Sequence, residues 1–555
     1  MPSVNELINN LNLDATLIKQ GLELLQRPRT VVMPDGQEEI LRPQVVISNN
    51  RVSRRVTYMS EVGIAKHLRR LLAAECEPLE DLSGIFDPGF TPDAIQLEAV
   101  ETIASSAVAV LTGGPGTGKT TLLKAILNAL QAAGHQVLCM APTGKAAQRM
   151  FEQTGRKSGT IHRTLGGAPG FFTFNQENPL PASAIVLDET SMVDVHLMCA
   201  VLEAINTGAR VLIVGDVDQL PSIGPGRVLF DLIAAGELPC VRLEKIYRQA
   251  DESRIPWVAR DINNGLVPND LAGEGTDFRF VEKDDAEAAA DLIVKAVSTY
   301  LPQQKGFSPN DIQVLAAQKG GRTDGAKALG VEQLNIRLQQ ELNPALNSES
   351  DVFIGAGYSC RRKDRVIHTK NDYKLNVMNG EVGFILDADP HGVDLAKFEG
   401  VWTSSMSGRA KSPDEDEDEA PTRSPFAQQM LGKGGKDKHV LVVSYDQGAR
   451  KIGYTGREAR QLHLAYAITV HKSQGSQFPA VIMPIHSVHG YMLTRPLVYT
   501  GITRAEKYVL CVGQPSALGK AARNTRGTDR LTRLQQRLRQ LDTTANNEYL
   551  EGDER

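Results

Sequence analysis

Short apolar runs alternate with longer segments of helical periodicity in the first half of this 555-residue chain. Four apolar runs follow one another with room for a helix between them: AVAVL (107–111), QVLCMA (136–141), AIVLD (184–188) and RVLIVGD (210–216). This alternation predicts βαβ units, in which helices cover both faces of a parallel sheet. We therefore predict an α/β domain over residues 89–250.

A second α/β region follows the first and shows the same type of pattern. Its strand-like runs are IQVLAAQ (312–318), AVIMPI (480–485) and KYVLCVG (507–513). The first of these runs is far from the other two, so the region is interrupted by an insertion. We expect its two parts at 251–375 and 456–545, followed by a polar tail at 546–555.

The interruption itself, residues 376–455, has the period-two alternation of a small β module. Within it, residues 403–438 are polar and include six consecutive acids at 414–419. Such a composition cannot bury enough apolar surface to fold, so we interpret this segment as a disordered loop between two strands. A nucleic-acid mimic or a partner-binding tail is the alternative interpretation of the acidic run.

Residues 1–88 carry a mixed pattern without a motif for chemistry. Helical periodicity at 4–25 and 61–75 flanks a strand-like VVIS at 45–48. We predict a small N-terminal domain, helical or α/β, ahead of the first parallel sheet.

The charge balance argues against a surface that attracts nucleic acid or membrane as a whole. The chain has 61 Lys and Arg against 66 Asp and Glu, a net charge of −5, which leaves room only for a locally basic groove. Its six cysteines are scattered without ligand spacing, as expected of thiols in a reducing compartment. The sequence starts without a secretory signal pattern and contains no apolar run of membrane-spanning length, so we expect a cytoplasmic protein.

The loop TGGPGTGKTT (112–121) follows the first apolar run directly and precedes a helical segment at 122–130. Its spacing G-x-x-x-x-G-K-T predicts a phosphate-binding loop, in which backbone N–H groups and a helix N-terminus face an anion. Lys119 would reach the β- and γ-phosphates of a nucleotide, and the Thr120 hydroxyl would contact Mg²⁺. The alternative, a glycine-rich turn without a ligand, fits the flanking strand and helix less well. The predicted nucleotide contacts are Gly114, Pro115, Gly116, Thr117, Gly118, Lys119, Thr120 and Thr121.

Two later strand ends carry polar residues suited to hydrolysis. Asp188 and Glu189 end the third apolar run, where Asp188 would hold Mg²⁺ and Glu189 would act as the base that orients water. Gln219, in VGDVDQLPSIGPG (214–226), would bond the γ-phosphate and report its loss. A helix-capping acid and a simple strand-to-helix connection are the alternatives, and the preceding phosphate loop favours ATP hydrolysis.

Two arginines could complete such a site. Arg248 lies where the chain leaves the first α/β domain, and Arg504 lies in the second. A guanidinium placed on developing phosphate charge raises the hydrolysis rate by orders of magnitude. Spacing alone leaves open whether these two are surface arginines without a ligand.

Nine sequence blocks together resemble the RecD-like group of superfamily 1 DNA helicases, named after the α subunit of bacterial exonuclease V. The resemblance covers about residues 90–540. The blocks, in order, are FTPDAIQLEAV (90–100), TGGPGTGKTT, APTGKAAQRM (141–150), GTIHRTL (159–165), VLDETSMVD, GDVDQLPSIGPG, YRQ, LAYAITVHKSQGSQFPAVI (464–482) and LVYTGITRAEK (497–507). The fold that this implies is α/β: two RecA-like parallel-sheet motor domains in tandem, with a small SH3-like β-barrel inserted in the second and a small N-terminal domain.

The resemblance also implies roles for individual residues. Gln96 would read the adenine edge, and Arg248 and Arg504 match the two γ-phosphate arginines of the group. Gln477 stands where the group commonly has a glutamate, which puts nucleotide affinity or selectivity in doubt. The implied contacts with single-stranded DNA are Pro142, Thr143, Thr160, His162, Phe172, Asn371, Thr469, His471 and Lys472.

A segment at about 168–182 resembles the hairpin pin that splits a duplex ahead of the motor, although hairpin aromatics are as often only packing. The implied activity is ATP- and Mg²⁺-dependent unwinding with 5′–3′ polarity, by a monomer acting on single-stranded DNA and single-strand/duplex junctions. A translocase without unwinding, or the motor subunit of a nuclease complex, is the alternative, with a nuclease or a single-strand-binding protein as partner. The group implies a bacterial or phage origin and association with the nucleoid, and the pathway stays open.

Overall fold

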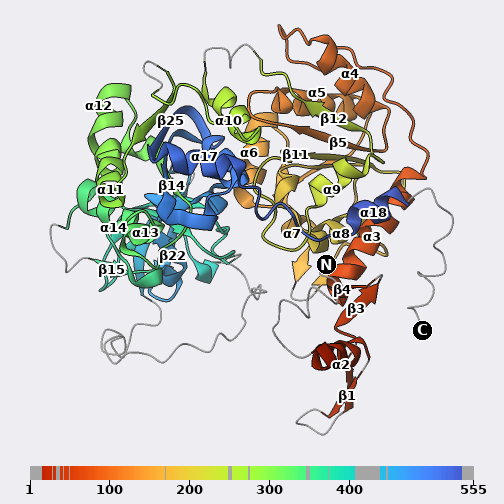
Figure 1. Ribbon diagram of the computed structural model, residues 1–555, viewed down its shortest axis with the longest axis horizontal. Coiled ribbons are helices and arrows are strands. Elements are labelled where there is room, and N and C mark those ends of the chain that lie inside the picture. Colours follow the sequence, from red (N-terminus) through yellow and green to blue (C-terminus); the bar gives the residue numbers. More distant parts are fainter. Residues whose placement is uncertain are drawn as a thin grey trace.

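The computed structural model describes residues 15–27, 29–32, 38–41, 43–48, 50–168, 171–247, 253–272, 276–345, 351–372, 374–406, 438–445 and 448–540. Arg248 and the acidic run 414–419 lie outside these residues. Two α/β domains stand next to each other, and the N-terminal segment projects from the first of them (Figure 1). Among the described residues, no helix has the length and apolarity needed to cross a membrane.

The first sheet is parallel throughout and has the strand order β12-β5-β11-β10-β6-β7. Its strands are β5 (Val108–Gly113), β6 (Val137–Ala141), β7 (Ser158–Thr160), β10 (Ala184–Leu187), β11 (Arg210–Gly215) and β12 (Cys240–Leu243). Every residue of β5, β10 and β11 is buried, as continuous apolar runs in a sheet covered on both faces require. The predicted parallel-sheet α/β fold is thus confirmed for this part of the chain.

Alternate residues of the central strands β5, β6, β10 and β11 enter two different hydrophobic cores. Val108 and Val110 pack with one set of helices, while Ala109 and Leu111 pack with the other. The first set is α3 (Arg55–Leu72), α8 (Val195–Glu203), α9 (Val228–Ala235) and α18 (Leu534–Arg539). The second is α4 (Ala94–Ala104), α5 (Lys119–Ala132) and α6 (Gly144–Thr154).

Two helices of the first set lie outside residues 89–250, the range predicted for the first α/β domain. Helix α3 belongs to the 1–88 segment, and α18 follows the second motor domain in sequence, yet Leu68 and Leu534 are buried in the same core. In Figure 1 the blue α18 lies against the red α3, among elements of the first domain. An amphipathic pattern shows that a helix buries one face, but it does not identify the partner of that face.

The second sheet is also parallel, with the order β13-β25-β24-β14-β23. Its strands are β13 (Phe278–Glu282), β14 (Ile312–Ala316), β23 (Ala467–Thr469), β24 (Phe478–Ile485) and β25 (Ala505–Gly513). Its helices are α10 (Ile255–Asn263), α16 (Arg495–Ile502) and α17 (Pro515–Arg523) on one face, and α11 (Ala286–Lys295) and α14 (Val331–Leu342) on the other. The tandem of two parallel-sheet domains is therefore confirmed.

The inserted β module extends on both sides of the range 376–455 expected from sequence. Its sheet has the order β19-β21-β20-β18-β17-β22 and is mainly antiparallel. The strands are β17 (Arg365–His368), β18 (Val382–Ala388), β19 (Val401–Trp402), β20 (His439–Tyr445), β21 (Arg450–Thr455) and β22 (Leu462–Leu464). Strands β17 and β22 pair with each other and close the module where the chain enters and leaves the second motor domain.

Ahead of α3, the described part of the N-terminal segment contains one helix and two short hairpins. These elements are α2 (Ala15–Gln26), β1 (Arg29–Val32), β2 (Glu38–Leu41), β3 (Val45–Ser48) and β4 (Arg51–Arg54). The strand expected at 45–48 is present as β3.

The chain returns from the second motor domain to the first over residues 524–540, which we call the strap. The strap leads from α17 of the second domain to α18, which packs on the first domain. Arg530 donates to the backbone carbonyl of Gly226 at 2.9 Å, in the loop that follows β11. Farther along, Arg537 pairs with the buried Glu61 carboxylate of α3 at 3.4 Å. This strap fixes the C-terminal segment to the first domain.

Candidate functional site

A cleft of about 800 Å³ lies between the two motor domains and is lined by residues of both. All of the predicted nucleotide contacts line it: Gln96, Gly114, Pro115, Gly116, Thr117, Gly118, Lys119, Thr120, Thr121 and Gln477. Asp188, Glu189, Gln219 and Arg504 line the same cleft. Residues separated by up to several hundred positions in sequence are thus brought together, although their individual roles remain predictions.

The loop after β5 has the shape of a phosphate cradle. Gly116 and Gly118 have φ values of 73° and 79°, a left-handed conformation that favours glycine. The Lys119 ammonium donates to the Gly113 carbonyl at 2.6 Å, which folds the side chain back over the loop. Within the described residues no side chain caps the first turn of α5, so its N–H groups are available to an anion. These features fit the phosphates of a nucleotide.

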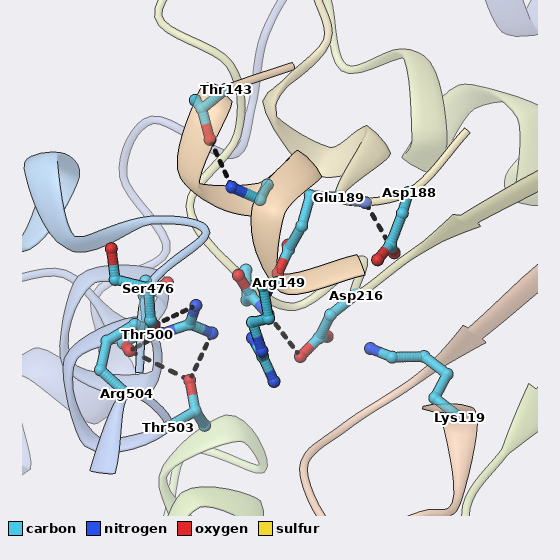
Figure 2. Close-up of polar contacts among 12 residues, drawn as sticks. Lys119, Thr143, Arg149, Asp188, Glu189, Asp216, Ser476, Thr500, Thr503 and Arg504 are labelled. Carbon is cyan, nitrogen blue, oxygen red and sulfur yellow. Dashed lines mark hydrogen bonds and ion pairs between the residues drawn. The ribbon is translucent and has the colours of Figure 1, made fainter. Parts of the chain in front are cut away.

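The acidic pair follows the buried strand β10 at the carboxyl edge of the sheet. Glu189 has φ 52° and ψ 39°, a left-handed conformation that is strained for a glutamate. Thr190 holds this turn in place, because its hydroxyl donates to the Val214 carbonyl of β11 at 2.8 Å. The backbone strain therefore turns the Glu189 side chain into the cleft, beside Asp188 (Figure 2).

The orientation of Asp188 is fixed locally, because its carboxylate accepts the Glu189 backbone N–H at 2.8 Å. Burial and the neighbouring Glu189 carboxylate raise the pKa of Asp188 to about 6. A bound divalent cation would offset both effects, since an opposite charge favours the ionised form. Asp188 and the Thr120 hydroxyl line the same cleft and fit the predicted Mg²⁺ contacts.

Gln219 lies in the loop after β11 and is only 7% exposed. Its amide nitrogen donates to the Asp216 carboxylate at 3.2 Å. Its amide oxygen is buried and has no hydrogen-bond partner among the described residues. An unpaired buried oxygen costs free energy, so this side chain is suited to a ligand with a donor, such as a water at the phosphates.

Arg504 reaches the cleft from the second domain, where β25 begins. Its guanidinium is almost fully buried and donates to the Thr500 carbonyl at 3.2 Å, the Ser476 carbonyl at 3.3 Å and the Thr503 hydroxyl at 3.3 Å. Burial lowers the pKa of Arg504 from its ordinary value. Figure 2 shows Arg504 on the side of the cleft opposite Lys119, which is the arrangement a cross-domain phosphate arginine needs.

The end of the cleft near Gln96 contains an aromatic residue that sequence reasoning missed. The Tyr247 ring lies so close to Gly118 that a Cβ there would be 3.3 Å from it, and Tyr247 lines the cleft with Phe90. The Gln96 amide oxygen accepts the Asp93 backbone N–H at 3.1 Å in a capping box. The spacing D-x-x-Q in the sequence signals that capping role, and it fixes the orientation of the Gln96 amide.

Helix α16 of the second domain is hydrogen-bonded to the loop after β11 in the first domain. The Tyr499 hydroxyl donates to the Asp216 carboxylate at 2.9 Å, and both residues are buried. Leu220 donates its backbone N–H to the Thr500 hydroxyl at 2.8 Å and accepts from the Gln474 amide at 3.0 Å. Burial and the Asp216 and Asp218 carboxylates raise the pKa of Tyr499, so its hydroxyl stays a donor.

Replacing Tyr499 with phenylalanine is expected to raise the KM for ATP by about tenfold while changing kcat at saturating ATP by less than about threefold. Loss of a buried hydrogen bond to a charged group costs about 1.5–3 kcal/mol, and here that cost falls on the closed arrangement of the domains. Steady-state ATPase kinetics measure both constants. Tyr491→Phe, at an exposed position of the same domain, is the control. An unchanged KM would mean that this contact does not control the cleft.

Three of the predicted DNA contacts share one structural role. Thr143 follows β6, whereas Thr160 ends the edge strand β7 and Thr469 ends the edge strand β23. Each of the three caps the helix that comes next. Their hydroxyls accept backbone N–H groups at 3.2, 3.2 and 3.3 Å. A capping hydroxyl keeps its own hydrogen for an acceptor such as a DNA phosphate.

The remaining residues that were predicted to contact DNA do not share one structural role. Pro142 precedes the first cap, and His471 and Lys472 follow the third; burial lowers the pKa of both of these side chains. Asn371 is exposed in the β module, and its amide oxygen accepts the Asn379 backbone N–H at 2.9 Å.

The predicted pin is a short hairpin of β8 (Gly167–Ala168) and β9 (Phe171–Phe172). Phe172 is half-buried, and its ring lies 5.9 Å from that of the exposed His162. Phe171 is 64% exposed. The structure thus brings the two predicted contacts His162 and Phe172 together and leaves the neighbouring Phe171 facing solvent.

Three family models match the chain. They are an AAA domain over residues 91–277, an ATP-dependent RecD-like DNA helicase SH3 domain over 334–396 and a UvrD-like helicase C-terminal domain over 464–512. The matches coincide with the first motor domain, the entry into the β module and the part of the second domain that carries Arg504.

Two curated proteins show similarity over most of the chain. An ATP-dependent RecD2 DNA helicase from Deinococcus radiodurans is 33% identical over 442 residues, covering 79% of this chain and 52% of that protein. A RecBCD enzyme subunit RecD from Mycobacterium tuberculosis is 30% identical over 481 residues, covering 80% of this chain and 72% of the subunit. The chain thus spans about half the length of the first relative and most of the second. Among solved structures, the Pif1 helicase from Candida albicans aligns with a TM-score of 0.45 at 18% identity, over 77% of this chain and 96% of its own.

Proposed function

The chain belongs to the RecD family of superfamily 1 helicases, and from this premise we propose that it is an ATP-dependent DNA helicase that moves 5′ to 3′ on single-stranded DNA and unwinds duplex. The observation that carries the proposal is the cleft in which the first domain supplies the phosphate loop, Asp188 and Glu189 while the second supplies Arg504. A site divided between two domains ties ATP hydrolysis to their relative motion.

In the proposed reaction, Lys119 and the N-terminus of α5 bind the phosphates of ATP. Thr120 and Asp188 would hold Mg²⁺, which would supply neutralisation of phosphate charge when bound. Glu189 orients the attacking water and accepts its proton. Gln219 and Arg504 contact the γ-phosphate from opposite domains, together with Arg248, whose placement lies outside the described residues.

Hydrolysis would then be coupled to movement along the strand. The predicted DNA contacts lie on both domains, with Thr143 and Thr160 on the first and Thr469 on the second. We propose that ATP closes the cleft and that loss of the γ-phosphate reopens it, so that one domain holds the strand while the other slides. Contacts to phosphates through hydroxyls make such binding independent of sequence and of a high net positive charge.

A second candidate is a motor subunit that works only within a larger nuclease complex. The similarity to most of a RecBCD enzyme subunit favours it. Such a subunit would hydrolyse ATP on single-stranded DNA but would not separate strands without its partners.

Strand displacement on two duplexes tests the proposal, one with a 5′ single-stranded tail and one with a 3′ tail, in the presence of ATP and Mg²⁺. We expect unwinding of the 5′-tailed duplex only, and no unwinding by Lys119→Ala. Unwinding of the 3′-tailed duplex alone would keep the helicase but contradict the polarity. DNA-stimulated ATPase without unwinding of either duplex would favour the motor-subunit function.

A further inference from the structure

Helix α6 lies where the first domain, the β module and the second domain meet. A Cβ at Gly475 of the second domain would be 3.0 Å from the Thr143 hydroxyl, which caps α6. A Cβ at Gly144 would be 2.9 Å from Met378 of the β module. The next residue, Lys145, places its ammonium 5.2 Å from the centre of the Phe478 ring. The first turn of α6 is therefore packed tightly against parts of the chain that would move when the cleft opens.

The middle of the same helix lies at the hydrolytic site. Arg149 lines the cleft, and its guanidinium nitrogen lies 3.9 Å from a carboxylate oxygen of Glu189. Its side chain is 26% exposed and that of Glu189 is 14% exposed, so the pair is partly shielded from water. In Figure 2, Arg149 projects from α6 into the space between Glu189 and Arg504, with Thr143 at the start of the helix. One helix thus joins a predicted DNA contact to the predicted catalytic base.

We propose that Arg149 is a positioning residue that restrains Glu189 until DNA binds at the first turn of α6. This inference rests on the proposed function, because it assigns the coupling between DNA and ATP hydrolysis to a particular ion pair. DNA bound at Thr143 shifts α6 against Gly475 and Met378, and the shift withdraws Arg149 from Glu189. DNA-stimulated hydrolysis is the result.

The restraint follows from the chemistry of a general base. A carboxylate that accepts a proton from water needs an oxygen lone pair that is free to bind that water. A nearby guanidinium competes with water for the carboxylate oxygens and holds the side chain away from the attacking water. At 3.9 Å the pair is loose enough to be broken by a small displacement of the helix.

The test is the ATPase rate of Arg149→Gln with and without a saturating oligodeoxythymidine single strand. We expect the DNA-free kcat to rise by roughly fivefold, as loss of a partly exposed ion pair allows, with the DNA-saturated kcat within about twofold of wild type. The stimulation factor would therefore fall, whereas the KM for ATP would stay unchanged. Arg149→Lys keeps the charge and is expected to keep the DNA-free rate low.

Glu152→Gln, an exposed position on the same helix, is the matched control and should retain the full stimulation factor. An unchanged DNA-free rate in Arg149→Gln would overturn the inference. So would a higher KM together with a lower DNA-saturated kcat, because that result would make Arg149 a contact of the nucleotide. If the wild-type rate did not respond to DNA, the proposed function and this inference would both fail, whereas a failure of Arg149→Gln alone leaves the proposed function standing.

Discussion

Glu189→Gln is expected to lower DNA-stimulated ATP turnover by about 10²–10⁴-fold while ATP binding is retained. Glutamine has the shape of glutamate and can still bond a water molecule, but it cannot accept the proton. The left-handed backbone at Glu189 aims this side chain into the cleft, and the Thr190 bond to Val214 keeps that turn fixed in the variant. Single-turnover ATPase measurements and a fluorescent ATP analogue separate the chemical step from binding.

The control for this variant is Glu98→Gln, an exposed position on α4 outside the cleft, which should hydrolyse ATP at the wild-type rate. A substantial DNA-stimulated rate in Glu189→Gln would show that another group acts as the base. If ATP binding were lost together with turnover, Glu189 would instead support the nucleotide or its cation.

Structural features that depend on contiguous residues can be predicted from the sequence of this chain. The central strands of both parallel sheets were predictable because a strand buried on both faces is a continuous apolar run, as in β5 and β24. The edge strands β7, β12, β13 and β23 were not predicted. The phosphate loop was predictable because its residues are contiguous in sequence. Its backbone also adopts left-handed φ values at Gly116 and Gly118, which favour glycine. The acidic pair was predictable because it ends a strand at the edge where ligands bind.

What the sequence pattern did not reveal depends on contacts between distant segments. Tyr499 and Asp216 are 283 positions apart, and only the packing of α16 on the first domain joins them. Arg149 has the periodicity of any arginine on a helix, and its proximity to Glu189 follows from how α6 packs on β6, the strand next to β10. Likewise, the apolar face of α18 gave no sign that it packs beside α3.

Contacts between distant segments also determine how the two motor domains can move relative to each other. Each motor domain has hydrophobic cores on both faces of its sheet and is expected to move as a unit, apart from the small displacement of α6 proposed above. The described contacts between the two domains include hydrogen bonds, such as those of Tyr499 with Asp216 and of Thr500 with Leu220. Hydrogen bonds of this kind can exchange as the cleft opens, whereas the strap at residues 524–540 keeps the domains tethered.

Arg504→Lys is expected to lower kcat by about 10³-fold with a small effect on the KM for ATP. The Arg504 guanidinium donates to two carbonyls and a hydroxyl of its own domain, which holds its planar group rigid at the cleft. A lysine ammonium cannot make these contacts and present a donor to the phosphate in the same geometry. Because the charge is kept, a loss of rate would report on geometry rather than on net charge.

The matched control is Arg523→Lys, at an exposed position on α17 of the same domain, for which we expect wild-type kinetics. Thermal unfolding of both variants excludes a loss of folding as the cause, since Arg504 is buried and Arg523 is not. A rise in KM at constant kcat would mean that Arg504 binds ATP equally in the ground state and the transition state. A fall in kcat with unchanged KM would instead show that Arg504 contributes in the transition state. Hydrolysis would then require that the second domain closes onto the first and brings Arg504 to the phosphate.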